Sequence, residues 1–304
     1  MAKKEVLPAR KFNPWARVSD EISQGPSLRK DLIDKIEKQL NAKVILFFTS
    51  FNNEEAMITD NDAEMIENIL SAEHNFGDKI ALVLNSAGGL GLAAERIVNV
   101  CRSYSQGKFE AIVPHMAKSA ATLICFGASC IRMSPTSELG PVDPQVPYLD
   151  DNGKEKWISA EEYVSSYDDL IKKATSGKTE RIEALLQQLT RYDSRQIEQL
   201  KSAQALSGNI SIKLLKSGMM STLKESDIKR RINNFLLHKQ TSSHGRMITM
   251  EEAKSCGLNV EKLELCSELW NLIWELYIRA NWVVSSRARK LIETKETSVN
   301  ISNN

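Results

Sequence analysis

The sequence lacks the features that mark secreted, membrane-spanning and metal-binding proteins. Its five cysteines are odd in number and form neither a Cys-x-x-Cys pair nor a Cys/His cluster with metal-site spacing. No apolar run approaches the roughly 18–20 residues of a transmembrane helix. Residues 1–15 are basic, but the roughly 7–15 apolar residues of a secretory signal do not follow them. We therefore expect a cytoplasmic protein with buried free thiols, no membrane span, no metal and no cofactor.

An excess of charge of either sign is also missing. The 304 residues include 40 basic and 39 acidic side chains, which gives a formal net charge of +1. This balance does not favour binding to nucleic acid or to an anionic membrane surface. The chain is 42% hydrophobic and 26% charged, as is typical of a globular protein that buries a sizeable core.

Strand and helix patterns alternate through residues 43–133. Segments with apolar residues at helical spacing lie between four short continuous apolar runs, which are typical of buried parallel strands. These runs are Lys43–Thr49, Lys79–Leu84, Phe109–Val113 and Cys130–Met133. The alternation predicts an α/β fold with a parallel sheet, right-handed crossovers and helices on the faces of the sheet.

Three parts are expected along the chain. They are an N-terminal arm (1–25), a main domain (26–265) with a helical insert at about 160–239, and a C-terminal helix and tail (266–304). The helix is predicted over Cys266–Lys290, where Trp270 and Trp274 share one face. An aromatic face of this kind indicates either core or an oligomer contact.

Two sharp turns follow the second and third predicted strands, at the edge of the sheet where ligand sites lie in such folds. The first contains Gly88-Gly89, and the second contains Ser119 at the start of an apolar helix. The N–H groups at the start of that helix can stabilise an oxyanion beside the serine hydroxyl. Taken singly, Ser119 is more readily an N-cap than a nucleophile, and Gly88-Gly89 is more readily a tight strand-to-helix turn. Together they favour a nucleophile beside an oxyanion hole.

Three motifs in this region resemble the Clp-peptidase/signal-peptide-peptidase-A superfamily, and within it the serine dehydrogenase proteinases. They are Ser86-Ala87-Gly88-Gly89, Ala117-Lys118-Ser119-Ala120-Ala121-Thr122 and Leu139-Gly140-Pro141-Val142-Asp143-Pro144-Gln145. The resemblance covers roughly residues 28–145 and resumes near 244–260. It implies a Clp/crotonase-like spiral of ββα units with a parallel sheet, together with a helical insert and a long C-terminal helix.

The resemblance also implies roles for single residues. Ser119 would be the nucleophile, and the oxyanion would be held by backbone N–H groups of Gly88 or Gly89 and of Ala120. A peptide substrate would lie extended beside the glycines and add a strand through main-chain hydrogen bonds. Ala87 stands where related peptidases usually have proline, which is a mild departure from the pattern.

The general base is less clearly indicated. Clp-type peptidases place a histidine after the nucleophile helix, and Val142 occupies the aligned position here. His244 lies at the start of a segment that resembles the closing element of the superfamily, and an imidazole suits a general base. With Asp143 to orient it, the triad would be Ser119, Asp143 and His244. The alternatives are Lys118 as the base, His244 as a loop contact, and Asp143 as a turn residue.

The sequence therefore favours a serine-type endopeptidase acting on a peptide or protein substrate through an acyl-enzyme. Two other functions stay open: a catalytically weak or inactive binding or scaffold protein of the same fold, and a crotonase-like acyl-coenzyme A enzyme. The second would not need a serine at position 119, and no adenine-pocket signature is present. The superfamily commonly forms rings or trimers, so the resemblance also implies a homo-oligomer.

Overall fold

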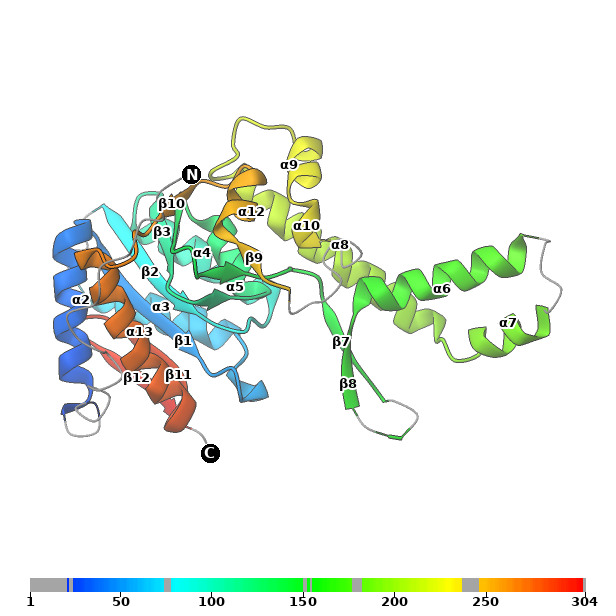
Figure 1. Cartoon of the computed structure of the whole chain (residues 1–304), viewed down its shortest axis with the longest axis horizontal. Helices are drawn as coiled ribbons and strands as arrows, with labels where there is room; N and C mark the ends of the chain where they lie inside the picture. Colours follow the sequence, from blue (N-terminus) through cyan, green and yellow to red (C-terminus); the bar gives the residue numbers. More distant parts are fainter. Residues whose placement is uncertain are drawn as a thin grey trace, which may run out of the picture.

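A seven-stranded mixed sheet forms the centre of the protein in a computed structural model (Figure 1). The structure describes residues 21, 24–73, 78–149, 152–153, 155–176, 182–236 and 246–302. The predicted arm at 1–25 and His244 therefore lie largely or wholly outside the described residues.

Five neighbouring strands of the sheet are parallel, in the order β10 (Val260–Lys262), β5 (Cys130–Met133), β3 (Lys108–Val113), β2 (Lys79–Asn85) and β1 (Lys43–Thr49). Two antiparallel strands, β11 (Ala288–Glu293) and β12 (Ser298–Ser302), extend the sheet beyond β1. The four strands predicted between residues 43 and 133 are all present. The α/β fold with a mostly parallel sheet is thus confirmed.

Helices cover both faces of this sheet, because its strands are apolar on both sides. One face packs against α3 (Asp60–Ala72), α4 (Gly91–Tyr104) and α5 (Ala120–Gly127); the other packs against α2 (Pro26–Leu40) and α13 (Glu268–Ser286). Strand β1 shows the alternation: Ile45 and Phe47 join the first core, and Val44, Leu46 and Phe48 join the second.

The C-terminal segment differs from the prediction. The helix expected over Cys266–Lys290 ends at Ser286, and the next residues form β11. Strand β11 pairs antiparallel with β1, and Leu291 and Ile292 are buried on opposite faces of the sheet. Pairing and burial within the sheet therefore override the helical pattern for residues 288–290. Trp270 is buried and stacks on Trp274, so this aromatic face is part of the core on α2.

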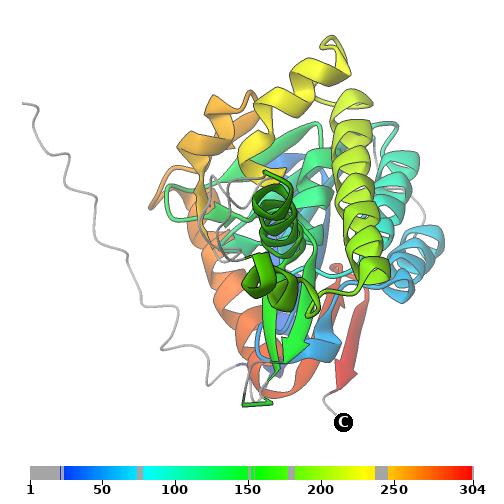
Figure 2. The same cartoon turned by 90° about the vertical axis from the view of Figure 1, so that its right-hand side faces the viewer.

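The insert contains the expected helices, namely α6 (Ala160–Thr175), α7 (Ile182–Leu189), α8 (Ser194–Lys216), α9 (Glu225–Arg231) and α10 (Asn233–Leu236). A hairpin of β7 (Gln145–Leu149) and β8 (Glu155–Ser159), which the sequence pattern does not indicate, precedes them. Helices α6 and α7 project from the sheet, and α8 runs back onto it (Figures 1 and 2). The proposed boundaries between domains stay a prediction.

A second, small sheet lies beyond the end of β3. It joins β4 (Met116–Ala117), β6 (Glu138–Leu139) and β9 (Ile248–Thr249), and α12 (Met250–Ser255) follows it. Three segments far apart in the sequence are thereby brought together: the residues before Ser119, the start of the Leu-Gly-Pro motif, and the predicted closing element.

Candidate active site

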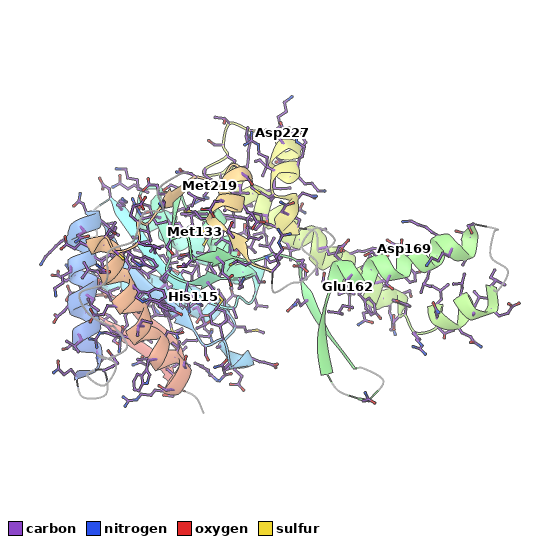
Figure 3. All side chains as sticks on the ribbon, viewed as in Figure 1. His115, Met133, Glu162, Asp169, Met219 and Asp227 are labelled. Carbon is purple, nitrogen blue, oxygen red and sulfur yellow. The ribbon has the colours of Figure 1, made fainter. Side chains whose placement is uncertain are left out.

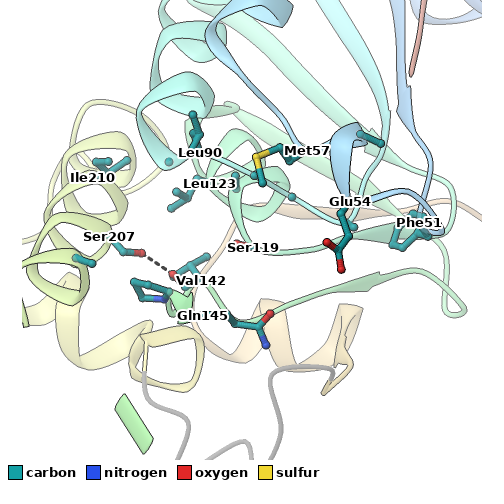
Figure 4. A pocket seen from close by; sticks show the side chains of 18 of the residues that line it. Phe51, Glu54, Met57, Leu90, Ser119, Leu123, Val142, Gln145, Ser207 and Ile210 are labelled. Atoms are coloured by element: carbon teal, nitrogen blue, oxygen red, sulfur yellow. Dashed lines mark hydrogen bonds between the residues drawn. The ribbon is translucent and has the colours of Figure 1, made fainter. Parts of the chain in front are cut away.

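Ser119 lies at the turn from β4 into α5 in a backbone conformation that is rare for a residue other than glycine. Its φ is 48° and its ψ is −118°, and such a conformation costs about 1–3 kcal/mol. It occupies the N-cap position of α5, yet its hydroxyl makes no capping hydrogen bond. The N-cap interpretation is therefore wrong for the hydroxyl, which faces a cavity (Figure 4).

The glycine turn approaches Ser119 so closely that no side chain fits between them. A Cβ on Gly88 would lie 2.7 Å from the Ser119 Cβ and 2.8 Å from the Lys118 carbonyl oxygen. A Cβ on Gly89 would lie 2.2 Å from the backbone nitrogen of Ile58. Both glycines also have a positive φ, 114° and 153°, so the turn requires glycine for space and for conformation.

Backbone hydrogen bonds join the two turns. The Ser86 N–H donates to the Met116 carbonyl over 3.1 Å, and the Lys118 N–H donates to the Ser86 carbonyl over 3.0 Å. The Asn85 side-chain oxygen accepts the Met116 N–H over 3.1 Å. The glycine turn and the Ser119 turn are thus held in register by main-chain pairing.

Two of the three predicted oxyanion donors are available. Among the described residues, no hydrogen bond takes up the N–H of Gly89 or of Ala120. Ala120 is the first residue of α5, where a backbone N–H has no partner within the helix. The Gly88 N–H donates to the Ser86 hydroxyl over 3.1 Å. This favours Gly89 over Gly88 as the donor from the glycine turn.

The cavity in front of Ser119 has a volume of about 710 Å³. Its walls come from the loop at residues 50–57, the glycine turn, the start of α5, residues 142–145 and the middle of α8 (Figure 4). Part of the wall of this cavity is therefore built from α8 of the insert.

Lys118 does not line this cavity, and its ammonium group is directed to other acceptors. Its Nζ lies 2.8 Å from Glu138 Oε1, and it is 3.4 Å from the Leu139 carbonyl and 3.5 Å from the Arg246 carbonyl. The lysine therefore ties the Ser119 turn to β6 and to the segment before β9.

The other predicted triad members are only partly accounted for. Arg246, two residues after His244, lies against Lys118, so the chain returns to the Ser119 turn directly after the predicted base. Asp143 is buried and lines a second cavity of about 650 Å³ with residues of α6 and α8. Its neighbours Val142 and Pro144 line both cavities. The triad stays a prediction.

His115, four residues before Ser119, is not part of the cavity. Its ring packs 5.3 Å from the ring of Tyr277 within the body of the protein (Figure 3). Burial lowers its pKa, an effect that Glu138 opposes and Lys118 reinforces. Among the described residues, its buried Nδ1 has no hydrogen-bond partner.

Thr122 is a supporting residue that the sequence analysis passed over, although it closes the Ala-Lys-Ser motif. Its hydroxyl oxygen lies 2.8 Å from the Ala117 carbonyl and 3.0 Å from the Gly140 carbonyl, and it accepts the Gly140 N–H over 3.1 Å. This one side chain therefore connects the nucleophile motif to the Leu-Gly-Pro motif. Its position within the motif was the available signal.

Within the described ranges, no group of three or more His, Cys, Asp and Glu side chains is arranged to hold a metal ion. No helix in that part of the chain combines the length and apolar character needed to cross a membrane.

Comparison with known proteins gives two uncharacterized relatives from Methanocaldococcus jannaschii. One is 29% identical over 221 residues, which cover 72% of this chain and 65% of the relative. The other is 39% identical over 67 residues, which cover 22% of this chain and 23% of the relative. The matches thus span less than two thirds of the length of either relative.

Two similar solved structures are mutants of the 1510-N membrane-bound stomatin-specific protease, one of them in complex with a substrate peptide. They are 20% and 15% identical, cover 73% and 68% of this chain and 93% of each neighbour, and have TM-scores of 0.27 and 0.28. A family model described as ClpP-like SDH-type serine proteinase matches residues 23–289. Because that match covers most of its length, the chain belongs to the family of ClpP-like SDH-type serine proteinases.

Proposed function

We propose that this protein is a serine-type endopeptidase that hydrolyses peptide bonds through an acyl-enzyme on Ser119. The observation that carries the proposal is the serine hydroxyl itself. It is held by a strained backbone at the start of α5, is not used as a cap, and faces a cavity beside the unpaired Ala120 N–H. Strain of this kind is typical of functional sites.

In the proposed reaction, the Ser119 oxygen bonds to the carbonyl carbon of the scissile peptide while its proton passes to the base. The oxyanion receives hydrogen bonds from the N–H groups of Ala120 and of Gly89 or Gly88. The C–N bond then breaks, and the amine leaves with the proton from the base. Water attacks the ester with the help of the same base, which releases the acid and restores the Ser119 hydroxyl.

The glycine turn supports the proposed binding mode of the peptide. Ile58 already pairs with one edge of this segment, through the Gly88 carbonyl over 2.8 Å and the Leu90 N–H over 2.9 Å. In an extended segment, successive residues direct their hydrogen-bonding groups to opposite sides. The Gly89 N–H and carbonyl are therefore left for a substrate strand on the other edge.

We favour His244 over Lys118 as the base, with Asp143 to orient it. The Lys118 ammonium is already bound by Glu138 and two carbonyls, whereas the segment after His244 lies at the same turn. His244→Ala should lower kcat at least about a hundredfold and should remove the acidic limb of the pH profile. Full activity with an unchanged pH profile in His244→Ala would refute this assignment.

The cellular compartment and the oligomeric state of the enzyme are also proposals. All five cysteines are free thiols, which supports a reducing compartment such as the cytoplasm. Exposed Ile182 and Leu186 on the projecting helix α7 support self-association. Light scattering on the purified chain tests the homo-oligomer, and a monomer at working concentrations would exclude it.

A fluorophosphonate probe tests the proposed nucleophile. Labelling and peptide hydrolysis should both be present in the wild type and should fall at least about a thousandfold in Ser119→Ala. Ser166→Ala, on α6 and away from the cavity, is the matched control and should label normally. A folded wild-type protein that neither labels nor hydrolyses peptides would support a binding protein of the same fold instead.

A further inference from the structure

The cavity in front of Ser119 has two unlike walls. The wall on the side of α8 is mostly apolar. Leu90, Leu123 and Ile210 lie there (Figure 4), and α8 also contributes Leu206 and Ser207 to the lining. The opposite wall is the loop at residues 50–57, which contributes Asn52, Asn53 and Glu54 besides apolar side chains. Among the described residues that line the cavity, Glu54 is the one with an ionisable side chain.

The apolar wall is incomplete without a ligand. Leu90 is 50% exposed and Leu206 is 46% exposed, although both lie beside the proposed nucleophile. Exposed apolar side chains that cluster in a cleft with a few polar groups are typical of ligand sites.

Several contacts hold α8 in place against the body. The Ser207 hydroxyl donates to the Val142 carbonyl over 2.5 Å, and Arg102 Nη2 donates to the Leu214 carbonyl over 3.0 Å. Lys213 Nζ lies 2.6 Å from Glu95 Oε1. The apolar wall is therefore preformed, which reduces the ordering cost of binding.

The loop presents Glu54 in the same preformed way. Asn53 caps the short helix η2 (Glu54–Ala56) by accepting the Glu55 N–H over 2.9 Å, and Glu55 itself pairs with Arg289. Glu54 is exposed, and no Lys, Arg or His among the described residues is within ion-pair distance of it. A carboxylate that pairs with none of the described basic residues, in a cleft whose described lining contains no Lys, Arg or His, attracts cations and repels anions.

We propose that Glu54 is a specificity-determining residue that selects peptides with a lysine or arginine side chain on the loop side of the cleft. The same peptides carry a large apolar side chain on the α8 side. Acidic residues near Glu54 are disfavoured. This inference rests on the proposed peptidase function and names its substrate class.

The test uses fluorogenic peptides with an apolar residue before the scissile bond and Lys, Gln or Glu placed at each other position in turn. Wild-type kcat/KM should favour Lys over Glu at one position, by about tenfold, as for a partly exposed ion pair. Glu54→Gln should reduce this ratio toward one, and Glu54→Lys should invert it. Glu64→Gln, an exposed glutamate on α3 outside the cavity, should leave the ratio unchanged.

Leu206→Asp tests the other wall, and it should reduce kcat/KM for peptides with a large apolar residue more than for peptides with alanine there. A fluorophosphonate too small to contact either wall separates the proposed peptidase function from the proposed role of Glu54. If it fails to label Ser119, the peptidase function itself is wrong. If it labels wild type and Glu54→Lys equally but the Lys/Glu ratio is the same in both, only the role of Glu54 is wrong.

Discussion

The central sheet and the projecting helices α6 and α7 differ in how many of their residues are buried. We refer to α6 and α7 as the arm, which is distinct from residues 1–25. Every residue of β1 is buried between two layers of helices. Helix α7 has no buried residue. Helix α6 buries only Ala160 and Val164, in a small cluster with Leu200 of α8 against which the partly buried Tyr163 packs. The sheet is therefore stabilised by tertiary packing, whereas the arm depends on local helix formation and a few contacts.

Helix α8 belongs to both regions. Its first half packs on α6 through Leu200, and its second half enters the main core through Ile210, Leu214 and Leu215. The residues between these halves face the Ser119 cavity. The weakly packed arm is thus joined to the Ser119 cavity by one continuous helix. Three experiments separate the contributions of the two regions.

We expect the largest difference between two glycine-to-alanine variants, Gly89→Ala beside Ser119 and Gly208→Ala in α8. Gly89→Ala places a Cβ 2.2 Å from the backbone of Ile58 at a positive φ, so the turn must move. We expect at least about a hundredfold slower probe labelling of Ser119, and a loss of about 1–3 kcal/mol in the free energy of unfolding.

Gly208→Ala is the matched change in α8, where the added Cβ meets nothing within 4 Å. It should raise the free energy of unfolding by up to about 1 kcal/mol, because alanine favours a helix over glycine, with unchanged labelling. Normal labelling of Gly89→Ala would show that the close approach of Gly89 to the backbone of Ile58 is not required.

A second pair of variants compares leucines of the two regions. Leu215 is fully buried where α8 meets the core, and Leu186 on α7 is 52% exposed. In urea unfolding, Leu215→Ala should lower the free energy of unfolding by about 2–5 kcal/mol. Leu186→Ala should change it by less than about 0.5 kcal/mol. A loss of similar size in Leu186→Ala would mean that the arm is packed in the functional protein, as in an oligomer.

The smallest effect concerns cysteine reactivity, and it follows from where the cysteines are. The helices of the arm contain none. Cys101 and Cys125 are buried in the body, and burial raises the pKa of Cys101 to about 12 and raises that of Cys125 as well. Both thiols should stay unlabelled by iodoacetamide at pH 8 while limited trypsin digestion cleaves α6 to α8. Labelling of Cys101 and Cys125 at the same rate as cleavage would show that the body and the arm unfold together.

The same contrast explains what the sequence could predict. Strands β1 and β5 begin and end at the predicted residues, because their apolar patterns follow directly from burial in a sheet. The first three residues of strand β11 were predicted as the end of a helix, because its pairing with β1 depends on residues more than two hundred positions away.

The candidate site was predictable only in part, and for a similar reason. Ser119 and the glycines stand at the ends of recognisable strands. The place of α8 in the cavity, the exposure of Glu54 and the packing of His115 on Tyr277 depend on how distant elements meet. No local pattern carries that information.

The main-chain pairing between the two turns bears on how freely this site can vary. Main-chain hydrogen bonds of Ser86, Met116 and Lys118 keep the turns in register, and the side chains of Asn85 and Ser86 add hydrogen bonds to Met116 and Gly88. A proline ring at position 87 would stiffen a turn that main-chain hydrogen bonds already hold against the Ser119 turn. Alanine at position 87 is therefore compatible with the observed position of Ser119.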